Sequence, residues 1–268
     1  WRSAPAPGLG CGKRGGAQRL RSMENTAEKA APARPGTELK AHQALFLSRG
    51  MLWLFWGLFL GLTLFFGQAS IHVFASGIRI PAHVVGSGLV LWGLRHLRRA
   101  GPLGGAGAFL LRGCALSAFF LAYLSPFVNW WMDAPDVPWF AGNFIGFLGM
   151  AMMLLLFVNL LCAELGGMLG AFGFRLEAHL SALSVVILLL TPFAVVLGFS
   201  LAAAVNFGST FSQEFYEMVI RVPYQCYFLF IGPCALALMV AWKARELCEL
   251  AFKAGSAAAK TRDPATGG

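Results

Sequence analysis

Residues 137–163 read VPWFAGNFIGFLGMAMMLLLFVNLLCA, a run of 27 residues without one Asp, Glu, Lys or Arg. A helix needs about 20 mainly apolar residues to cross the hydrocarbon core of a bilayer, which is about 30 Å thick. A spanning segment has no water to bind its backbone polar groups, so it satisfies them internally as an α-helix. This run therefore predicts a membrane-spanning helix.

Further stretches without charge lie on both sides of this run, and they cover residues 50–78, 80–94, 113–132, 178–213 and 222–242. The second stretch is short, but Arg79 and Arg95 can extend it by placing their stems in lipid and their guanidiniums at the interfaces. The sequence thus predicts an all-α integral membrane protein that forms a six-transmembrane-helix bundle. The expected spans are about 51–69, 80–97, 113–132, 140–163, 181–204 and 219–242. Residues 206–218 are expected to form a polar connector with a short interfacial helix.

The composition supports the same class. Hydrophobic residues make up 57% of the 268 residues and charged residues only 12%, about half the usual share of a soluble domain. A water-facing surface needs more charge than this, so a soluble enzyme, a disordered chain and a disulfide scaffold are all excluded. The formal net charge is +9, but no basic and aromatic motif accompanies it, so nucleic acid is not an expected partner.

Lysine and arginine lie almost entirely on one side of the predicted bundle. When the chain is folded back and forth through six spans, only Arg79 and Arg221 of the 21 basic residues fall on the opposite side. The positive-inside rule then places both termini in the cytoplasm. We therefore expect a multi-pass protein of a bacterial inner membrane or plasma membrane. Its expected partners are the lipid bilayer and anionic lipid headgroups at the cytoplasmic face.

The two ends of the chain are polar. Residues 1–50 contain scattered Pro, Gly and Arg, and we interpret them as a disordered basic segment. The chain opens with Trp1, and Met23 begins a more ordinary start, so residues 1–22 are considered as lying upstream of the true start. Residues 243–268 are expected to form a cytoplasmic amphipathic helix followed by a disordered tail.

No familiar catalytic or metal-binding motif occurs in the sequence. It has no phosphate-binding loop, no serine-hydrolase elbow and no zinc-protease motif, and its six cysteines lack the spacing of metal ligands. No catalytic residue, metal or cofactor is therefore predicted. Pairs of glycines four residues apart predict close helix packing, either within the bundle, with a membrane-protein partner or in a homo-oligomer. These pairs are Gly57 with Gly61, Gly142 with Gly146, and Gly166 with Gly170.

Polar residues gather at the predicted outer face. They form either a binding site or a set of salt bridges that hold the outer loops together. The candidate residues of this outer polar face are Arg79, Asn129, Asp133, Asp136, Asn143 and Arg221. The turn DAPDVP at 133–138 is stiffened by proline. We expect Arg79 or Arg221 to form an ion pair with Asp133 or Asp136. Loop bracing is the interpretation that the sequence favours over a site.

Two further pairs of residues are candidates for function. His72 and His83 lie at the outer ends of the first two predicted spans and are possible haem ligands. The favoured alternative is that both bind loop carbonyl groups. Pro192 and Pro233 lie in the middle of the last two spans. Each removes a backbone hydrogen bond and is expected to kink its helix, with Thr191 as the nearest partner for a freed carbonyl.

Three functional interpretations remain open. The leading one is a non-enzymatic scaffold or accessory subunit that packs through its glycine-rich helices, since no catalytic motif is found and no ionisable residue lies at the middle of a span. The first alternative is a small transporter or channel component that uses the helices kinked at Pro192 and Pro233. The second alternative is a membrane enzyme or haem-binding subunit whose site is the outer polar face.

Overall fold

The computed structural model describes residues 41–67, 70–73, 78–101, 103–207, 209–221 and 224–262. These residues belong to the unit Leu39–Gly268 and are almost entirely helical. Four segments are long and apolar enough to cross a membrane, namely His42–Thr63, Gly104–Asp133, Pro138–Met168 and Phe172–Asn206. The prediction of a helical membrane protein is therefore confirmed.

The first half of the described chain begins with a close helix pair. Helix α2 covers Ala41–Gly67 and helix α3 covers Ala82–Arg99. Between them lies an antiparallel hairpin of β1 (Ser70–Val73) and β2 (Ile78–Pro81), which the sequence did not predict. Helix α4 (Gly104–Asp133) then packs against α3.

The second half consists of helices that run back and forth along the same bundle. Helix α5 covers Pro138–Met168, and Pro138 stands in its first turn, where a missing N–H costs nothing. Helix α6 (Phe172–Val185), the π-helical segment η1 (Val186–Leu190) and α7 (Thr191–Phe207) follow one another directly. Helix α8 (Phe211–Arg221) is short, and helix α9 (Tyr224–Arg262) closes the described chain.

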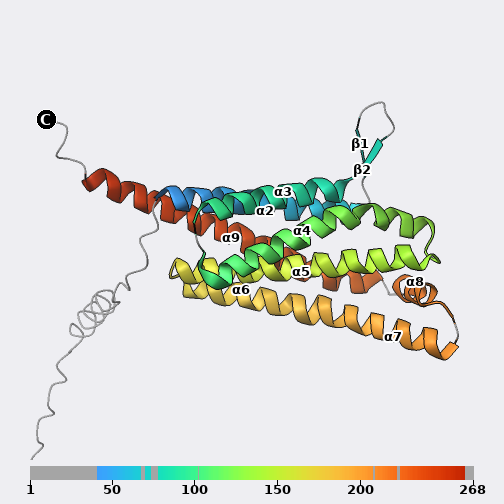
Figure 1. Cartoon of the computed structure of the whole chain (residues 1–268). Helices are drawn as coiled ribbons and strands as arrows, with labels where there is room; N and C mark the ends of the chain where they lie inside the picture. The colour runs from blue at the N-terminus through green and yellow to red at the C-terminus, as the bar shows by residue number, and fades with distance from the viewer. Residues whose placement is uncertain are drawn as a thin grey trace, which may run out of the picture. The chain divides into compact units, whose positions relative to one another are not determined.

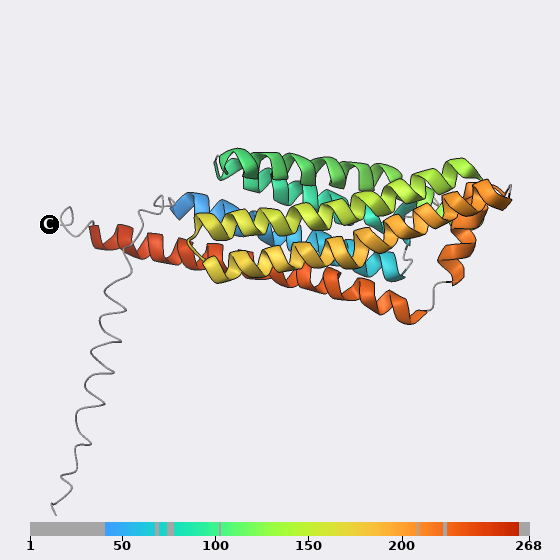
Figure 2. The same cartoon turned by 90° about the horizontal axis from the view of Figure 1, so that it is seen from below.

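The bundle has two distinct ends (Figure 1). We call one the basic end, because it holds the start of α2, the α3–α4 loop, the α5–α6 turn and the extension of α9, with Arg98, Arg112 and Arg175 among its residues. We call the other the hairpin end, because it holds the strands β1 and β2, the α4–α5 turn and α8. Figure 2 shows α9 extending beyond the other helices at the basic end.

The side chains that face outward from the bundle are largely apolar. Trp92, Phe119 and Phe199 are 50%, 58% and 64% exposed. A soluble protein rarely exposes so many large apolar groups together, whereas a surface that contacts lipid tails has no reason to be polar. The interior holds a continuous cluster of buried residues from α2, α3, α4, α5, α6 and α9.

Helices α2 and α3 approach closely because glycines lie at their contact. A Cβ atom added to Gly57 would lie 2.7 Å from the carbonyl oxygen of Gly86. One added to Gly86 would lie 2.9 Å from the Cα atom of Gly61. Two turns further along, a Cβ atom added to Gly93 would lie 2.7 Å from the carbonyl oxygen of Gly50. Small residues thus allow two backbones to meet, as in other membrane helix pairs.

Several predicted boundaries need correction. Helix α2 begins at Ala41, so residues 41–50 are helical and not part of a disordered segment. The reason is that Ala44 and Leu47 are buried, which continues the apolar seam of the span. Residues 1–40 lie outside the described residues.

The predicted connectors at the basic end are also shorter than expected. Residues 164–180 are helical except for the turn at 169–171, where Gly170 has a φ of 71° that favours glycine. Helix α4 begins at Gly104, nine residues before the expected span. Helix α9 continues to Arg262 through the alanine-rich segment that was expected to be a disordered tail, since alanine is the strongest helix former.

Candidate functional site

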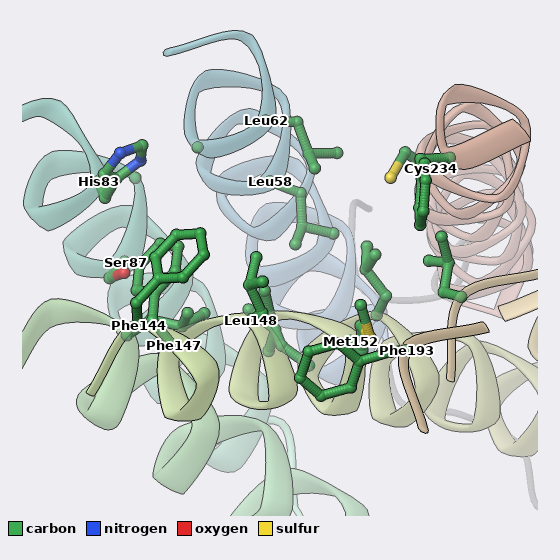
Figure 3. Close-up of a pocket in the computed structure, with 18 of the residues that line it drawn as sticks. Leu58, Leu62, His83, Ser87, Phe144, Phe147, Leu148, Met152, Phe193 and Cys234 are labelled. Atoms are coloured by element: carbon green, nitrogen blue, oxygen red, sulfur yellow. The ribbon is translucent and has the colours of Figure 1, made fainter. Parts of the chain in front are cut away.

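The candidate site is a pocket of about 290 Å³ inside the bundle. Its walls come from α2, α3, α4, α5, η1, α7, α8 and α9. Figure 3 shows Leu58 and Leu62 of α2 facing Leu148 and Met152 of α5 across this space. The volume lies near the lower limit of the usual range for ligand pockets, which is about 300–1,000 Å³.

Small residues on the pocket wall create this space. Gly61 lines the pocket, and a Cβ atom added there would have no heavy atom within 4 Å. Ala151 of α5 also lines it and presents only a methyl group. Larger side chains at these two positions would occupy the pocket. The gap is therefore a consequence of the sequence itself, since α2 and α5 each contribute a small residue to the pocket wall.

The lining is almost wholly apolar. His83 and Ser87, one turn apart on α3, are the only side chains with nitrogen or oxygen among the described residues that line the pocket. Figure 3 shows both on one side of the pocket and Cys234 of α9 on the other. His83 hydrogen-bonds to the backbone of Gly61 and lies 5.4 Å from the ring of Phe147. Ser87 as a residue is 6% exposed, and its hydroxyl has no hydrogen bond within the described part of the chain.

Both predicted proline positions adjoin the pocket. Pro192 lines it directly, and Pro233 precedes Cys234, which also lines it. Pro192 follows the π-helical segment η1, whose wider turns make room for the proline ring. The Thr191 hydroxyl donates a hydrogen bond of 2.9 Å to the carbonyl oxygen of Val186. Pro233 lies inside the continuous helix α9.

The outer polar face does not assemble into a cluster. Asp133, Asp136 and Asn129 are exposed, and no ion pair of either aspartate occurs among the residues that the structure describes. The Asn143 amide donates a hydrogen bond of 2.7 Å to the Trp139 carbonyl oxygen on its own helix. These side chains therefore bind backbone or face outward, and they do not converge on a common point.

The predicted ion pair between Arg221 and Asp133 or Asp136 is wrong. Arg221 instead pairs with Glu217 of α8 at 2.7 Å. A partner four residues earlier on the same helix is always within reach, so it competes well against a carboxylate on another loop. The carbonyl oxygen of Asp136 does tie α8 to the α4–α5 turn, because it accepts a hydrogen bond of 3.1 Å from Ser212.

Of the predicted histidine pair, only His83 has a described side chain. His72 lies opposite Arg79 in the hairpin register, but the side chains of both lie outside the described residues. The pairing of Arg79 with an aspartate therefore stays a prediction. No group of three or more His, Cys, Asp or Glu side chains suited to a metal ion occurs within the described ranges. Cys114, Cys162, Cys234 and Cys248 are buried free thiols.

Of the remaining glycine pairs, Gly142 with Gly146 makes no close helix contact of the α2–α3 kind, whereas a Cβ atom added to Gly166 would lie 3.2 Å from the backbone nitrogen of Arg175. A Cβ atom added to Gly142 would meet nothing within 4 Å, and one added to Gly146 would lie 3.5 Å from Leu124. Gly166 instead lies against the start of α6, where an added Cβ atom would be 2.8 Å from the Phe174 ring.

Sequence reasoning missed the pocket because it depends on which helix faces meet. The available signal was the set of small residues Gly57, Gly61, Gly86 and Ala151, together with Pro192. Of these, Gly57 and Gly61 were interpreted as packing positions and Pro192 as a kink, one helix at a time. Their joint effect on a shared volume requires the three-dimensional arrangement.

Comparison with known protein families, with curated proteins and with solved structures gave no match for this chain.

Proposed function

We propose that the protein is a multi-pass membrane protein that binds an apolar molecule in the pocket of its bundle. The observation that carries this proposal is the pocket itself, about 290 Å³ lined almost wholly by carbon. An empty apolar space inside a bundle deprives its lining atoms of van der Waals partners. Apolar spaces inside proteins accept apolar guests.

The placement of the polar side chains narrows the chemistry of the bound molecule. His83 and Ser87 stand together on α3, and the other lining residues that the structure describes offer no further side-chain oxygen or nitrogen. The hydroxyl of Ser87 is both a donor and an acceptor. A molecule with one hydrogen-bonding end and an apolar body, such as a segment of a lipid chain with its polar end, satisfies both parts of the pocket.

Filling the pocket tests this proposal. Ala151→Phe adds a ring to the pocket wall, so we expect it to displace the bound molecule while the protein remains folded. The measurement is mass spectrometry of organic extracts from the protein purified in mild detergent, expressed as bound molecule per protein. The matched control is Ala202→Phe, which adds the same ring to an exposed position on α7. Equal amounts of the same bound molecule in the wild type and both variants would contradict the proposal.

Transport of the bound molecule is a second candidate function. The specific observation in its favour is that the π-helical segment and Pro192 adjoin the pocket, since such local irregularities often accompany functional sites. The scaffold interpretation has less support, because Gly57, Gly86 and Gly93 are used for contact between α2 and α3 of the same chain.

We also propose that α3 and α9 cross the bilayer, which gives six spans with both termini in the cytoplasm. Both helices run the length of the bundle between its two ends (Figure 1). If only the four helices that meet the length and composition criteria crossed the membrane, the basic residues of the α3–α4 loop would not lie on the same side as Lys243. With α3 spanning, Arg95, Arg98 and Arg99 lie on the same side as Arg175 and Lys243, as the positive-inside rule favours.

Reporter fusions test this topology. Fusions after residue 100, after residue 175 and at the C-terminus are expected to report the cytoplasm, and fusions near residues 136 and 212 the opposite side. The physical reason is the concentration of arginine and lysine at the basic end. Paired reporters that are active on opposite sides of the membrane serve as mutual controls. A non-cytoplasmic signal after residue 100 would remove α3 from the set of spans.

A further inference from the structure

A groove of about 710 Å³ lies between α3 and α4 near the basic end, separate from the pocket. Its two charged lining residues are Arg98 of α3 and Arg112 of α4. Both are exposed, and neither forms an ion pair or hydrogen bond within the described part of the chain. Two guanidiniums therefore share one groove without a protein carboxylate to neutralise them.

The groove becomes apolar away from the arginines. Leu91 stands seven residues before Arg98, and Phe119 seven residues after Arg112, and both line the groove. Leu91 therefore lies about two helical turns from Arg98 along α3, and Phe119 about two turns from Arg112 along α4, in each case away from the basic end. Leu116 and Phe119 are 57% and 58% exposed on the outside of the bundle. The groove thus leads from a cationic mouth onto the surface that faces lipid tails.

The start of α4 adds to the positive potential at this mouth. Leu103 is the N-cap residue and makes no capping hydrogen bond through its side chain, which leaves the first-turn N–H groups of α4 without a side-chain acceptor. Leu103 and Ala108 both line the groove, so this helix end borders it. The positive end of the helix dipole favours an anion at the same place.

We infer that this groove binds an anionic phospholipid. Its phosphodiester headgroup lies between Arg98 and Arg112, and an acyl chain lies along Leu91, Ala115 and Phe119. Basic pockets between membrane helices at the cytoplasmic side are suited to acidic headgroups, and a guanidinium can bind phosphate oxygens through two parallel hydrogen bonds. The apolar floor of the groove selects a lipid over a free phosphate ion. The inference does not rest on the function proposed for the pocket.

The test measures binding of phosphatidylglycerol to the full chain by native mass spectrometry in mild detergent. Removing a basic side chain near an anionic headgroup is expected to weaken binding about fivefold, so Arg98→Gln combined with Arg112→Gln should weaken it roughly 30-fold. The matched control combines Arg95→Gln with Arg99→Gln, which removes the same charge from exposed positions outside the groove. This control is expected to bind phosphatidylglycerol as the wild type does.

Two further measurements distinguish a phospholipid headgroup from a free phosphate ion. Ala115→Trp keeps both arginines but fills the groove, and it is expected to reduce phosphatidylglycerol binding. Inorganic phosphate in large excess is expected not to displace the lipid. Equal losses in the two arginine pairs, equal binding of phosphatidylcholine, or displacement by inorganic phosphate would each overturn the inference. Melting temperatures of all variants establish that they are folded.

Discussion

Replacement of Gly86 by leucine is expected to destabilise the protein by about 3 kcal/mol or more, because it forces α2 and α3 apart. A Cβ atom at Gly86 already lies 2.9 Å from the Gly57 carbonyl oxygen and from the Cα atom of Gly61. These are backbone atoms, which cannot rotate away as a flexible side chain can. The measurement is the melting temperature of the purified protein in detergent.

Gly88→Leu is the matched control for this substitution. Gly88 lies two residues further along α3, is exposed, and has no heavy atom within 4 Å of an added Cβ atom. Leucine is a better helix former than glycine by about 0.7–1 kcal/mol, so this variant is expected to be as stable as the wild type or slightly more stable. Similar melting temperatures for Gly86→Leu and Gly88→Leu would show that the two helices do not depend on a close backbone contact.

The long apolar helices are the part of the fold that the sequence predicts best, because hydrophobicity and charge act within one segment at a time. The run 137–163 corresponds to the core of helix α5 at Pro138–Met168. The ends of the helices are predicted less well. Helix α2 starts at Ala41 because Ala44 and Leu47 find buried positions on their neighbours, and no property of those residues alone distinguishes burial from exposure.

The side-chain partners of the polar residues were harder to predict than the spans. Arg221 was expected to reach an aspartate across a loop, yet Glu217 on its own helix provides a partner at 2.7 Å. Such a local pair can be predicted from the four-residue spacing. The groove at Arg98 and Arg112 depends instead on the register between α3 and α4, as the pocket depends on the faces that α2 and α5 present to each other. Contacts of this kind follow from packing and not from any one segment.

The hairpin end is held by an aromatic cluster that joins α4, α5 and α8. Trp131 is only 2% exposed and stacks on Phe144 with ring centroids 4.0 Å apart and planes inclined by 10°. It also lies 6.0 Å from the Phe215 ring and 5.6 Å from the Tyr216 ring of α8. Phe215 is itself buried, and both it and Phe144 line the pocket. Trp131 thus helps to hold α8 against the bundle, together with the hydrogen bond from Ser212 to the Asp136 carbonyl oxygen.

Trp131→Ala is therefore expected to cost about 3–5 kcal/mol and to release α8 from the bundle. Removal of the indole leaves a void beside Phe144 and Phe215 that the neighbouring helices can close only in part. Amide hydrogen exchange across residues 211–221 measures the release directly, and we expect it to accelerate strongly there while α2 and α3 exchange as in the wild type. Trp130→Ala is the matched control, since Trp130 is the adjacent residue and is 49% exposed.

Trp131→Phe separates the packing of the ring from its polar atom. The indole N–H of Trp131 is buried, and no hydrogen-bond partner for it lies in the described part of the chain. Phenylalanine removes this unpaired donor and keeps an aromatic ring on Phe144, so we expect it to retain most of the stability that alanine loses. If Trp131→Phe lost as much stability as Trp131→Ala, or if α8 exchanged at the wild-type rate in Trp131→Ala, the attachment of α8 would have to come from other contacts, such as the hydrogen bond from Ser212 to the Asp136 carbonyl oxygen.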